Sequence, residues 1–171
     1  GFTWKNENEF WLNDGQKYYL FNTVTKKGKT ISSLTDDAEN ATFNEASENI
    51  AYTRNNNLYI QDADGAKIKV TLNDDKNIVS GQAIARSEFG ITNGIFWSPN
   101  GSRLAFYQKD ESKVHDYPLL ENDAYPGALK SIQYPMAGQF SESPKVGIFD
   151  IATKNTVFII LQCFFICYTI A

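Results

Sequence analysis

GIFWSPNGSRLAFY, at residues 94–107, shows most clearly how this chain folds. An apolar run led by aromatic residues meets a polar Ser-Pro-Asn-Gly turn, and a second run of aliphatic and aromatic residues follows. Aromatic and β-branched side chains favour strands, whereas Asn-Gly favours the positive φ that tight turns need. The stretch therefore predicts two antiparallel strands joined by a short turn.

Similar units recur along the chain, one led by Phe43 and a weaker one by Trp11. The predicted strands are Lys17–Asn22, Asn49–Arg54, Asn57–Gln61, Lys67–Leu72, Gly94–Trp97, Arg103–Lys109 and Val146–Ile151. No long segment has helical periodicity, and residues 44–49 form one helical turn at most. Stacked four-stranded units are typical of propeller blades. We predict an all-β fold, a partial β-propeller of about three four-stranded blades whose ring is incomplete.

Two long insertions, residues 74–93 and 110–145, interrupt these units. Loops of this length in a compact β domain are usually functional or cover an edge. We interpret the aromatic side chains near the turn as blade core, namely Phe96, Trp97 and Phe106. We expect three tyrosines to pack the second insertion against the ring, with a dimer surface as the alternative, namely Tyr117, Tyr125 and Tyr134.

The composition excludes several function classes. Among 171 residues, 16 Lys and Arg stand against 20 Asp and Glu, a net charge of −4, which argues against nucleic acid or a lipid surface as partners. The two cysteines, Cys163 and Cys167, provide no disulfide framework, and their apolar run has no His nearby to complete a zinc site. The Asp pairs lack the spacing of a calcium loop, and no Gly-rich phosphate cradle occurs. We therefore predict no metal and no cofactor.

Beyond these patterns, the chain resembles the N-terminal β-propeller domain of dipeptidyl peptidase IV-like serine peptidases, of the prolyl oligopeptidase clan. The resemblance covers about residues 42–157 and lies in the order of several motifs rather than in one alone. The matching motifs are IAY at 50–52, NNLYI at 56–60, IVSG at 78–81, EFGI at 88–91, the stretch 94–107, DESKV at 110–114, DYPL at 116–119, YP at 125–126 and YPMAG at 134–138.

The resemblance implies an exopeptidase that releases dipeptides after a penultimate Pro or Ala. A Ser-Asp-His triad in a C-terminal α/β-hydrolase domain performs that chemistry, while two adjacent Glu of the propeller bind the free N-terminal ammonium of the substrate. The match puts the second of these at Glu88 and the first at Ser87, so the pair is incomplete. We therefore expect Glu88 to bind the substrate N-terminus, with contributions from Ser87 and Phe89.

No catalytic residue is predicted, because no G-x-S-x-G nucleophile motif occurs. The single histidine, His115, lies in the second insertion, and the spacing of Ser112, His115 and Asp116 does not support a triad. The predicted partners are the peptide substrate, the remaining blades and the hydrolase domain of a full-length protein, and a homodimer is left open. By resemblance, the protein is exported to the periplasm or the cell surface.

We divide the chain into a partial propeller at residues 1–158 and an atypical apolar tail at residues 159–171. The tail is explained either as a truncated or frame-shifted end or as a weak membrane anchor, although it is shorter than the roughly 20 residues that a spanning helix needs. The alternative function is a non-catalytic β-propeller that binds proteins. A continuation of the coding sequence with a G-x-S-x-G motif would favour the peptidase over this alternative.

Overall fold

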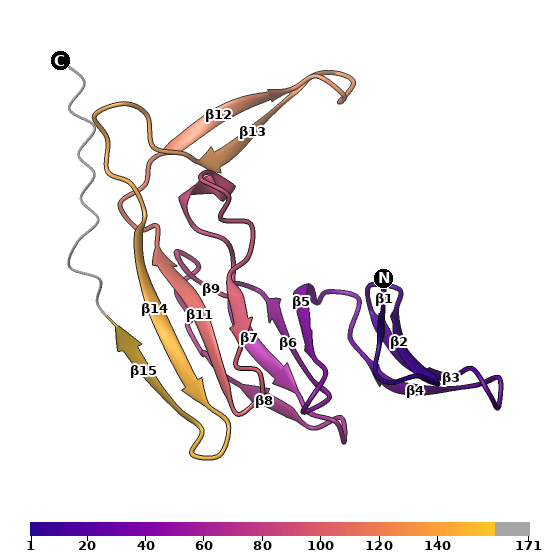
Figure 1. Cartoon of the computed structure of the whole chain (residues 1–171). Coiled ribbons are helices and arrows are strands. Elements are labelled where there is room, and N and C mark those ends of the chain that lie inside the picture. Colours follow the sequence, from indigo (N-terminus) through magenta and orange to yellow (C-terminus); the bar gives the residue numbers. More distant parts are fainter. Residues whose placement is uncertain (160–171) are drawn as a thin grey trace.

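The computed structural model of the chain describes residues 1–159, without the side chain of Arg86, and consists almost entirely of antiparallel strands (Figure 1). The first sheet has the order β1 (Phe2–Trp4), β2 (Glu9–Asn13), β3 (Lys17–Asn22) and β4 (Lys27–Ser33). The second has the order β5 (Glu39–Asn44), β6 (Asn49–Arg54), β7 (Asn57–Gln61) and β8 (Lys67–Lys69). The third has the order β10 (Ile95–Trp97), β11 (Arg103–Asp110), β14 (Ser143–Asp150) and β15 (Asn155–Ile159), and β9 (Ile78–Ser80) also pairs with β11.

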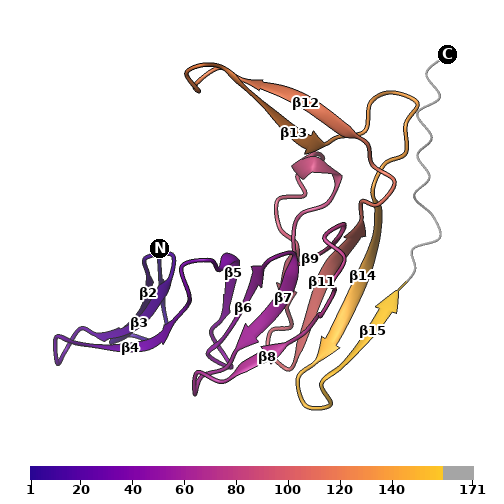
Figure 2. The same cartoon turned by 180° about the vertical axis from the view of Figure 1, so that it is seen from behind.

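The three sheets stand side by side in chain order and form an open arc (Figures 1 and 2). This confirms the prediction of an all-β, partial β-propeller with about three four-stranded blades. Leu58, Phe106 and Phe149 belong to one buried apolar cluster, and Tyr18 and Ile50 belong to another. Each cluster joins neighbouring sheets, so the removal of apolar surface from water holds the blades together.

Side-chain hydrogen bonds also link the second sheet to the third. The indole Nε1 of Trp97 donates to the backbone oxygen of Thr42 at 3.0 Å. The amide Nδ2 of Asn44 donates to the backbone oxygen of Ser98 at 3.2 Å. The turn between β10 and β11 therefore sits against the turn between β5 and β6, and Gly101 lies where the two turns meet.

Gly101→Ala should destabilise the protein by about 1–2 kcal/mol more than Gly65→Ala, because overpacking is added to backbone strain. Both glycines have positive φ, +69° and +86°. A Cβ on Gly101 would lie 2.3 Å from the Oγ of Ser47, whereas one on Gly65 would meet nothing within 4 Å. Urea unfolding followed by tryptophan fluorescence measures the difference. Equal losses in the two variants would contradict this tight contact between the turns.

Most predicted strands coincide with observed ones, and the differences are local. The predicted strand at residues 67–72 is shortened to β8, and no helical turn forms at residues 44–49, where residues 45–48 make the hairpin turn between β5 and β6. The predicted turn at Asn55 and Asn56 joins β6 to β7, and both residues have positive φ, as asparagine tolerates.

The assignment of three aromatic residues to the blade core is correct for Phe106 and wrong for Phe96. Phe106 is fully buried, and Trp97 is half-buried against the core cluster. Phe96 is 41% exposed, and its ring contacts Tyr107 edge to face. The reason is the alternation of a strand: Ile95 and Trp97 occupy the inward face of β10, so the side chain between them points outward.

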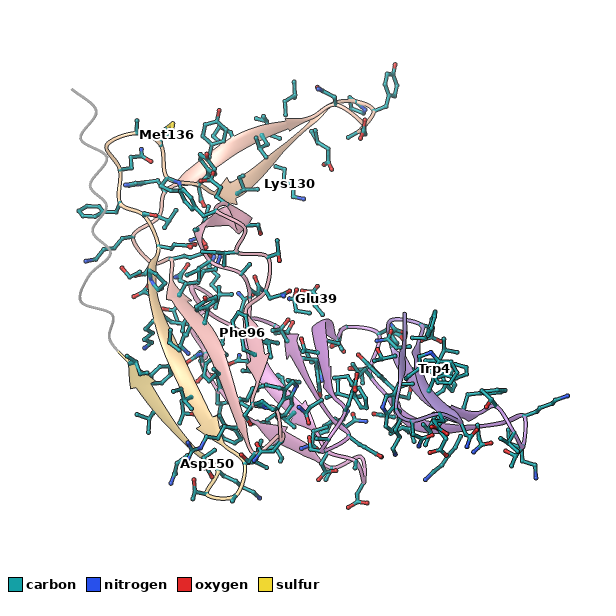
Figure 3. The ribbon with its side chains drawn as sticks, viewed as in Figure 1. Trp4, Glu39, Phe96, Lys130, Met136 and Asp150 are labelled. Carbon is teal, nitrogen blue, oxygen red and sulfur yellow. The ribbon has the colours of Figure 1, made fainter. Side chains whose placement is uncertain are left out.

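The second insertion forms a hairpin of β12 (Asp116–Glu121) and β13 (Ala128–Gln133), which pair with each other and project from the sheets (Figure 1). Figure 3 shows Lys130 on this hairpin, at the opposite end of the structure from Asp150. Tyr125 at the tip is fully exposed, so the prediction that it packs against the ring is wrong. Tyr117 and Tyr134 contact each other at the base, with ring centroids 6.0 Å apart. A role of the hairpin in a dimer stays a prediction.

The predicted apolar tail at residues 159–171 lies outside the described residues, except for Ile159 at the end of β15. The cysteines Cys163 and Cys167 fall in the same undescribed part. Within residues 1–159, no helix has the length and apolar character needed to cross a membrane.

Candidate functional site

The candidate site begins with an interruption of the inner strand of the third sheet. Both β9 and β10 pair with β11, β9 opposite residues 108–110 and β10 opposite residues 104–106. Between them, the backbone N–H of Tyr107 donates to the oxygen of Gly94 at 3.0 Å, and its carbonyl accepts from the N–H of Gly81 at 2.8 Å. The chain therefore leaves the inner strand after Gly81 and returns to it at Gly94. Of the predicted insertion at residues 74–93, residues 78–80 form β9, and residues 82–93, here called the excursion, lie between the two parts of the inner strand.

Glycine is required where the two ends of the excursion meet. A Cβ on Gly94 would lie 2.2 Å from the backbone carbonyl carbon and oxygen of Gln82. Gly81 has a φ of +77°, and its Cβ would lie 2.7 Å from the Cγ2 of Thr53. A side chain at Gly94 would push against backbone, and one at Gly81 would combine a positive φ with overpacking against neighbouring side chains, so these glycines let the excursion close on itself.

All three predicted site residues lie in the excursion, at and directly after the helical turn η1 (Ala85–Ser87). Ser87, Glu88 and Phe89 are exposed, with Phe89 at 79%. The backbone N–H of Glu88 donates to the oxygen of Ala85 at 2.9 Å, which closes the turn. Among the described side chains, the Glu88 carboxylate has no ion-pair partner. Because Glu88 is exposed, a cationic group from outside this part of the chain can reach its carboxylate.

The backbone of this turn is strained. Ala85, Ser87 and Phe89 have φ values of +52°, +61° and +56°, in the left-handed region that residues with a side chain rarely adopt. Each such residue costs on the order of 1–2 kcal/mol. The conformation persists because neighbouring groups hold it, and such strain concentrates at ligand-binding sites.

A buried charged cluster holds the turn from behind. The carboxylate Oε1 of Glu142 accepts the backbone N–H of Ala85 at 2.6 Å. The Nζ of Lys109 lies 3.3 Å from the Oε2 of Glu142 and 2.9 Å from the Oε1 of Glu111. These three side chains are 6–11% exposed. Sequence analysis missed this cluster, because Lys109 and Glu142 are 33 residues apart and nothing local links them.

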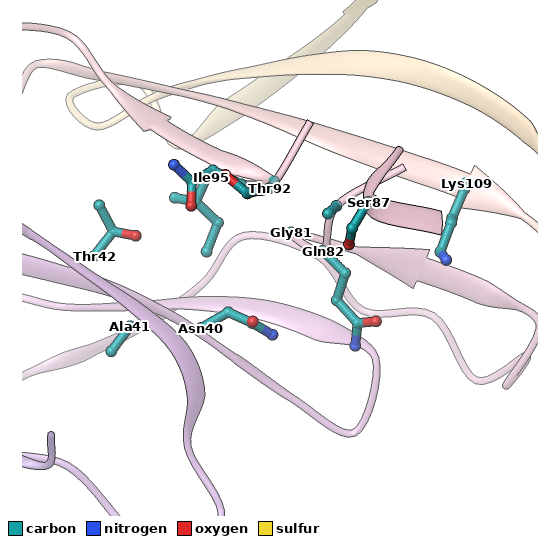
Figure 4. A pocket seen from close by; sticks show the side chains of 12 residues that line it. Asn40, Ala41, Thr42, Gly81, Gln82, Ser87, Thr92, Ile95 and Lys109 are labelled. Atoms are coloured by element: carbon teal, nitrogen blue, oxygen red, sulfur yellow. The ribbon is translucent and has the colours of Figure 1, made fainter. Parts of the chain in front are cut away.

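A cavity of about 450 Å³ lies between β5 and the excursion (Figure 4). Asn40 and Thr42 face Gln82 and Ile95 across it, so its lining combines amide, hydroxyl and aliphatic groups (Figure 4). Ser87 also lines this cavity. The carboxylate of Glu88 and the exposed ring of Phe89 therefore directly follow a residue that lines this cavity.

The residues considered for a catalytic triad lie in the segment that leads into the hairpin. His115 is exposed, and its backbone oxygen accepts the N–H of Tyr134 at 3.1 Å. Hydrogen bonds from the hydroxyl and the backbone N–H of Ser112 hold the pKa of Asp110 below its usual value. Within residues 1–159, no group of three or more His, Cys, Asp or Glu side chains is arranged to hold a metal ion.

The three antiparallel meander sheets, the third with an interrupted inner strand, define this part of the protein as a segment of a β-propeller. Residues 3–166 match the family described as the dipeptidyl peptidase IV (DPP IV) N-terminal region. The match extends over most of the sequence, so the chain belongs to this family. The resemblance inferred from the motifs is thereby confirmed.

Relatives with known names agree with this membership. The chain is 26% identical over 159 residues to the "Probable dipeptidyl-aminopeptidase B" of Uncinocarpus reesii, a match that covers 82% of the chain and 17% of the relative. It is 27% identical over 173 residues to the protein of the same name from Paracoccidioides lutzii, covering 90% of the chain and 19% of that relative. The chain therefore spans less than a fifth of the length of these curated relatives.

Two solved structures have similar folds. A Bacteroides ovatus protein assigned as a dipeptidyl aminopeptidase IV aligns with a TM-score of 0.78 and 37% identity, over 93% of this chain and 22% of that one. Porphyromonas gingivalis dipeptidyl peptidase 4 aligns with a TM-score of 0.69 and 23% identity, over 95% of this chain and 23% of that one. The second likeness concerns the fold alone.

Proposed function

We propose that this chain is the part of a DPP IV-like serine exopeptidase that recognises the free N-terminus of a peptide substrate. Its role is to orient peptides and control their access, while cleavage after a penultimate Pro or Ala belongs to an α/β-hydrolase domain of the longer protein. One observation carries the proposal: Glu88 is an exposed carboxylate on a strained turn that a buried cluster anchors. Family membership supports the same reading.

The chemistry of the turn suits an ammonium group. An N-terminal ammonium has three N–H donors and no acceptor, so it needs oxygen acceptors that converge on one point. The carboxylate of Glu88 supplies charge-assisted acceptors, and the hydroxyl of Ser87 adds a neutral, weaker one. The exposed ring of Phe89 offers a face for a cation–π contact. One carboxylate where the family uses two predicts weaker binding than a complete pair would give.

The proposal includes the partners that such a protein requires. The remaining blades would cover the faces of the first and third sheets against which no described sheet packs, because exposed apolar faces otherwise invite aggregation. The hydrolase domain would supply the nucleophile that acts on the oriented peptide. By resemblance to the family, export to the periplasm or cell surface is also part of the proposal.

Glu88→Gln should weaken binding of a peptide with a free N-terminus by roughly 1.5–3 kcal/mol, because the ammonium exchanges a charged acceptor for a neutral one. This corresponds to about 10–150-fold in Kd. The measurement is calorimetric titration of the chain with an X-Pro tetrapeptide and with its N-acetylated form. The acetylated peptide should bind equally weakly to both proteins, because it has no ammonium.

Two further variants make this experiment specific. Glu45→Gln changes an exposed glutamate in the turn between β5 and β6 and should leave binding unchanged. Ser87→Glu restores the pair of carboxylates and should tighten binding of the free peptide only. If the unaltered chain binds the free and acetylated peptides with the same affinity, recognition of the N-terminus is ruled out.

A second candidate function, a non-catalytic propeller that binds proteins, draws on the projecting hairpin. Leu120, Tyr125 and Leu129 of this hairpin are 64%, 103% and 76% exposed, an arrangement suited to contact with another protein. The coding sequence downstream discriminates between the two candidates. A continuation with G-x-S-x-G supports the exopeptidase, and an unrelated gene directly after a stop codon supports the binding module.

A further inference from the structure

We propose that Glu142, held by Lys109, is a positioning residue that sets where the turn carrying Glu88 lies. The inference rests on the proposed function for the identity of the ligand, an N-terminal ammonium. That Glu142 holds the turn concerns only residues of this chain, so this claim can be tested without any peptide.

The contact between Glu142 and the turn has the geometry of a strong hydrogen bond. The donor is the backbone N–H of Ala85, the first residue of η1, and the acceptor is the Oε1 of Glu142, 2.6 Å away. A carboxylate acceptor makes such a bond shorter and stronger than a neutral one. Because Ala85 and Glu88 are joined by the hydrogen bond that closes the turn, fixing Ala85 also fixes the start of Glu88.

The turn needs an external constraint of this kind. Positive φ at Ala85, Ser87 and Phe89 makes the observed conformation unfavourable for the isolated segment. The closure of the excursion at Gly81 and Gly94 fixes its two ends but not its tip. Glu142 lies 57 residues from Ala85 in the sequence, so its carboxylate ties the tip to a separate part of the fold.

Lys109 connects this carboxylate to the rigid part of the blade. Its backbone lies in β11, where it pairs with Val79 of β9 and Pro144 of β14. Its ammonium lies between the carboxylates of Glu111 and Glu142, and all three side chains are almost completely buried. Lys109 therefore fixes Glu142 relative to β11, the central strand of the third sheet. The ammonium also balances the charge of the carboxylate that accepts the Ala85 N–H.

Two substitutions of Glu142 separate positioning from general stability. Glu142→Ala removes both the hydrogen bond and the ion pair. Glu142→Gln keeps an oxygen acceptor of the same reach and removes only the charge. Glu121→Ala, at an exposed glutamate of the hairpin in the same insertion, is the matched control.

Amide hydrogen exchange of the whole chain, followed by NMR, gives the first readout. In Glu142→Ala, exchange of the amides of residues 85–88 should rise roughly tenfold or more, as expected for loss of one hydrogen bond to a charged group. Amides of β6 and β11 should keep their rates. Glu142→Gln should restore most of the protection, and Glu121→Ala should change nothing.

The Ala85 amide proton gives the second readout, which remains available if Glu142→Ala fails to fold. Its resonance should move upfield in Glu142→Gln, because a carboxylate acceptor is replaced by an amide. Unchanged exchange at residues 85–88 in a folded Glu142→Ala protein would overturn the proposal. So would a uniform rise across all strands, or an unmoved Ala85 resonance in Glu142→Gln.

Peptide titration of the same variants then links the turn to recognition. Glu142→Ala should weaken binding of the free peptide and leave the acetylated peptide unaffected, and Glu142→Gln should recover most of the loss. If Glu88→Gln has no effect on peptide binding, the proposed function fails. The exchange data would still decide whether Glu142 holds the turn, so the two failures are distinguishable.

Discussion

Lys109→Met is expected to lower the free energy of unfolding by about 3–5 kcal/mol, the loss typical when one partner of a buried ion pair is removed. Methionine fills a similar volume but has no charge, so the carboxylates of Glu111 and Glu142 remain buried without a cation. Both contact Lys109 within 3.3 Å and are at most 10% exposed. Urea unfolding of the whole chain, followed by tryptophan fluorescence, measures the loss.

Arg103→Met is the matched control, because it removes an ion pair at the other end of the same strand. Arg103 is 67% exposed, and its Nε lies 3.5 Å from the Oδ2 of Asp150. Exposed pairs of this kind contribute about 0–1 kcal/mol, so the free energy of unfolding of this variant should stay close to that of the unaltered protein. Equal losses in the two variants would show that burial does not make the Lys109 ion pairs contribute more to stability than the exposed pair of Arg103 and Asp150.

Phe106→Ala is expected to cost about 3–5 kcal/mol, because it removes a fully buried aromatic ring and leaves a cavity. The ring fills the space above Gly147, where an added Cβ would lie 2.4 Å from its Cζ. Gly147→Ala alone should therefore cost about 1–3 kcal/mol through overpacking. The same urea unfolding experiment measures both variants.

The double variant tests whether the two sites share one space. Combined with Phe106→Ala, the methyl group of Gly147→Ala should enter the vacated volume, so the total loss should be smaller than the sum of the single losses. Gly127→Ala, whose Cβ would come no closer than 3.8 Å to a neighbouring atom, should change stability by less than about 1 kcal/mol. Strict additivity of the two core substitutions would show that the ring and the glycine are not packed together.

The repeat of blades was predictable because its signals are local. Aromatic-led runs and turn residues such as Asn55 and Asn56 determine strands and hairpins within a few neighbouring positions. Which side of a strand faces the core was harder to predict. The run Ile95-Phe96-Trp97 is apolar at every position, so the pattern contains no alternation to show that Phe96 points outward.

The candidate site was predicted as a set of residues but not as a structure. Family motifs pointed to Ser87, Glu88 and Phe89, and these are adjacent and exposed on one turn. The buried support of that turn was not predictable, because Glu142 meets Ala85 across 57 residues of sequence. The strand β9 was also missed, since its three residues appear as part of a long loop until β11 pairs with them.

The interrupted inner strand has a consequence for how this surface can change. Tyr107 holds both ends of residues 82–93 through its own main chain, so the register of the blade does not depend on what lies between them. The excursion is therefore an insertion whose flanking residues, Gly81 and Gly94, are fixed by the blade. Insertions, deletions or substitutions within it can therefore change this surface while the pairing of the blade strands stays the same.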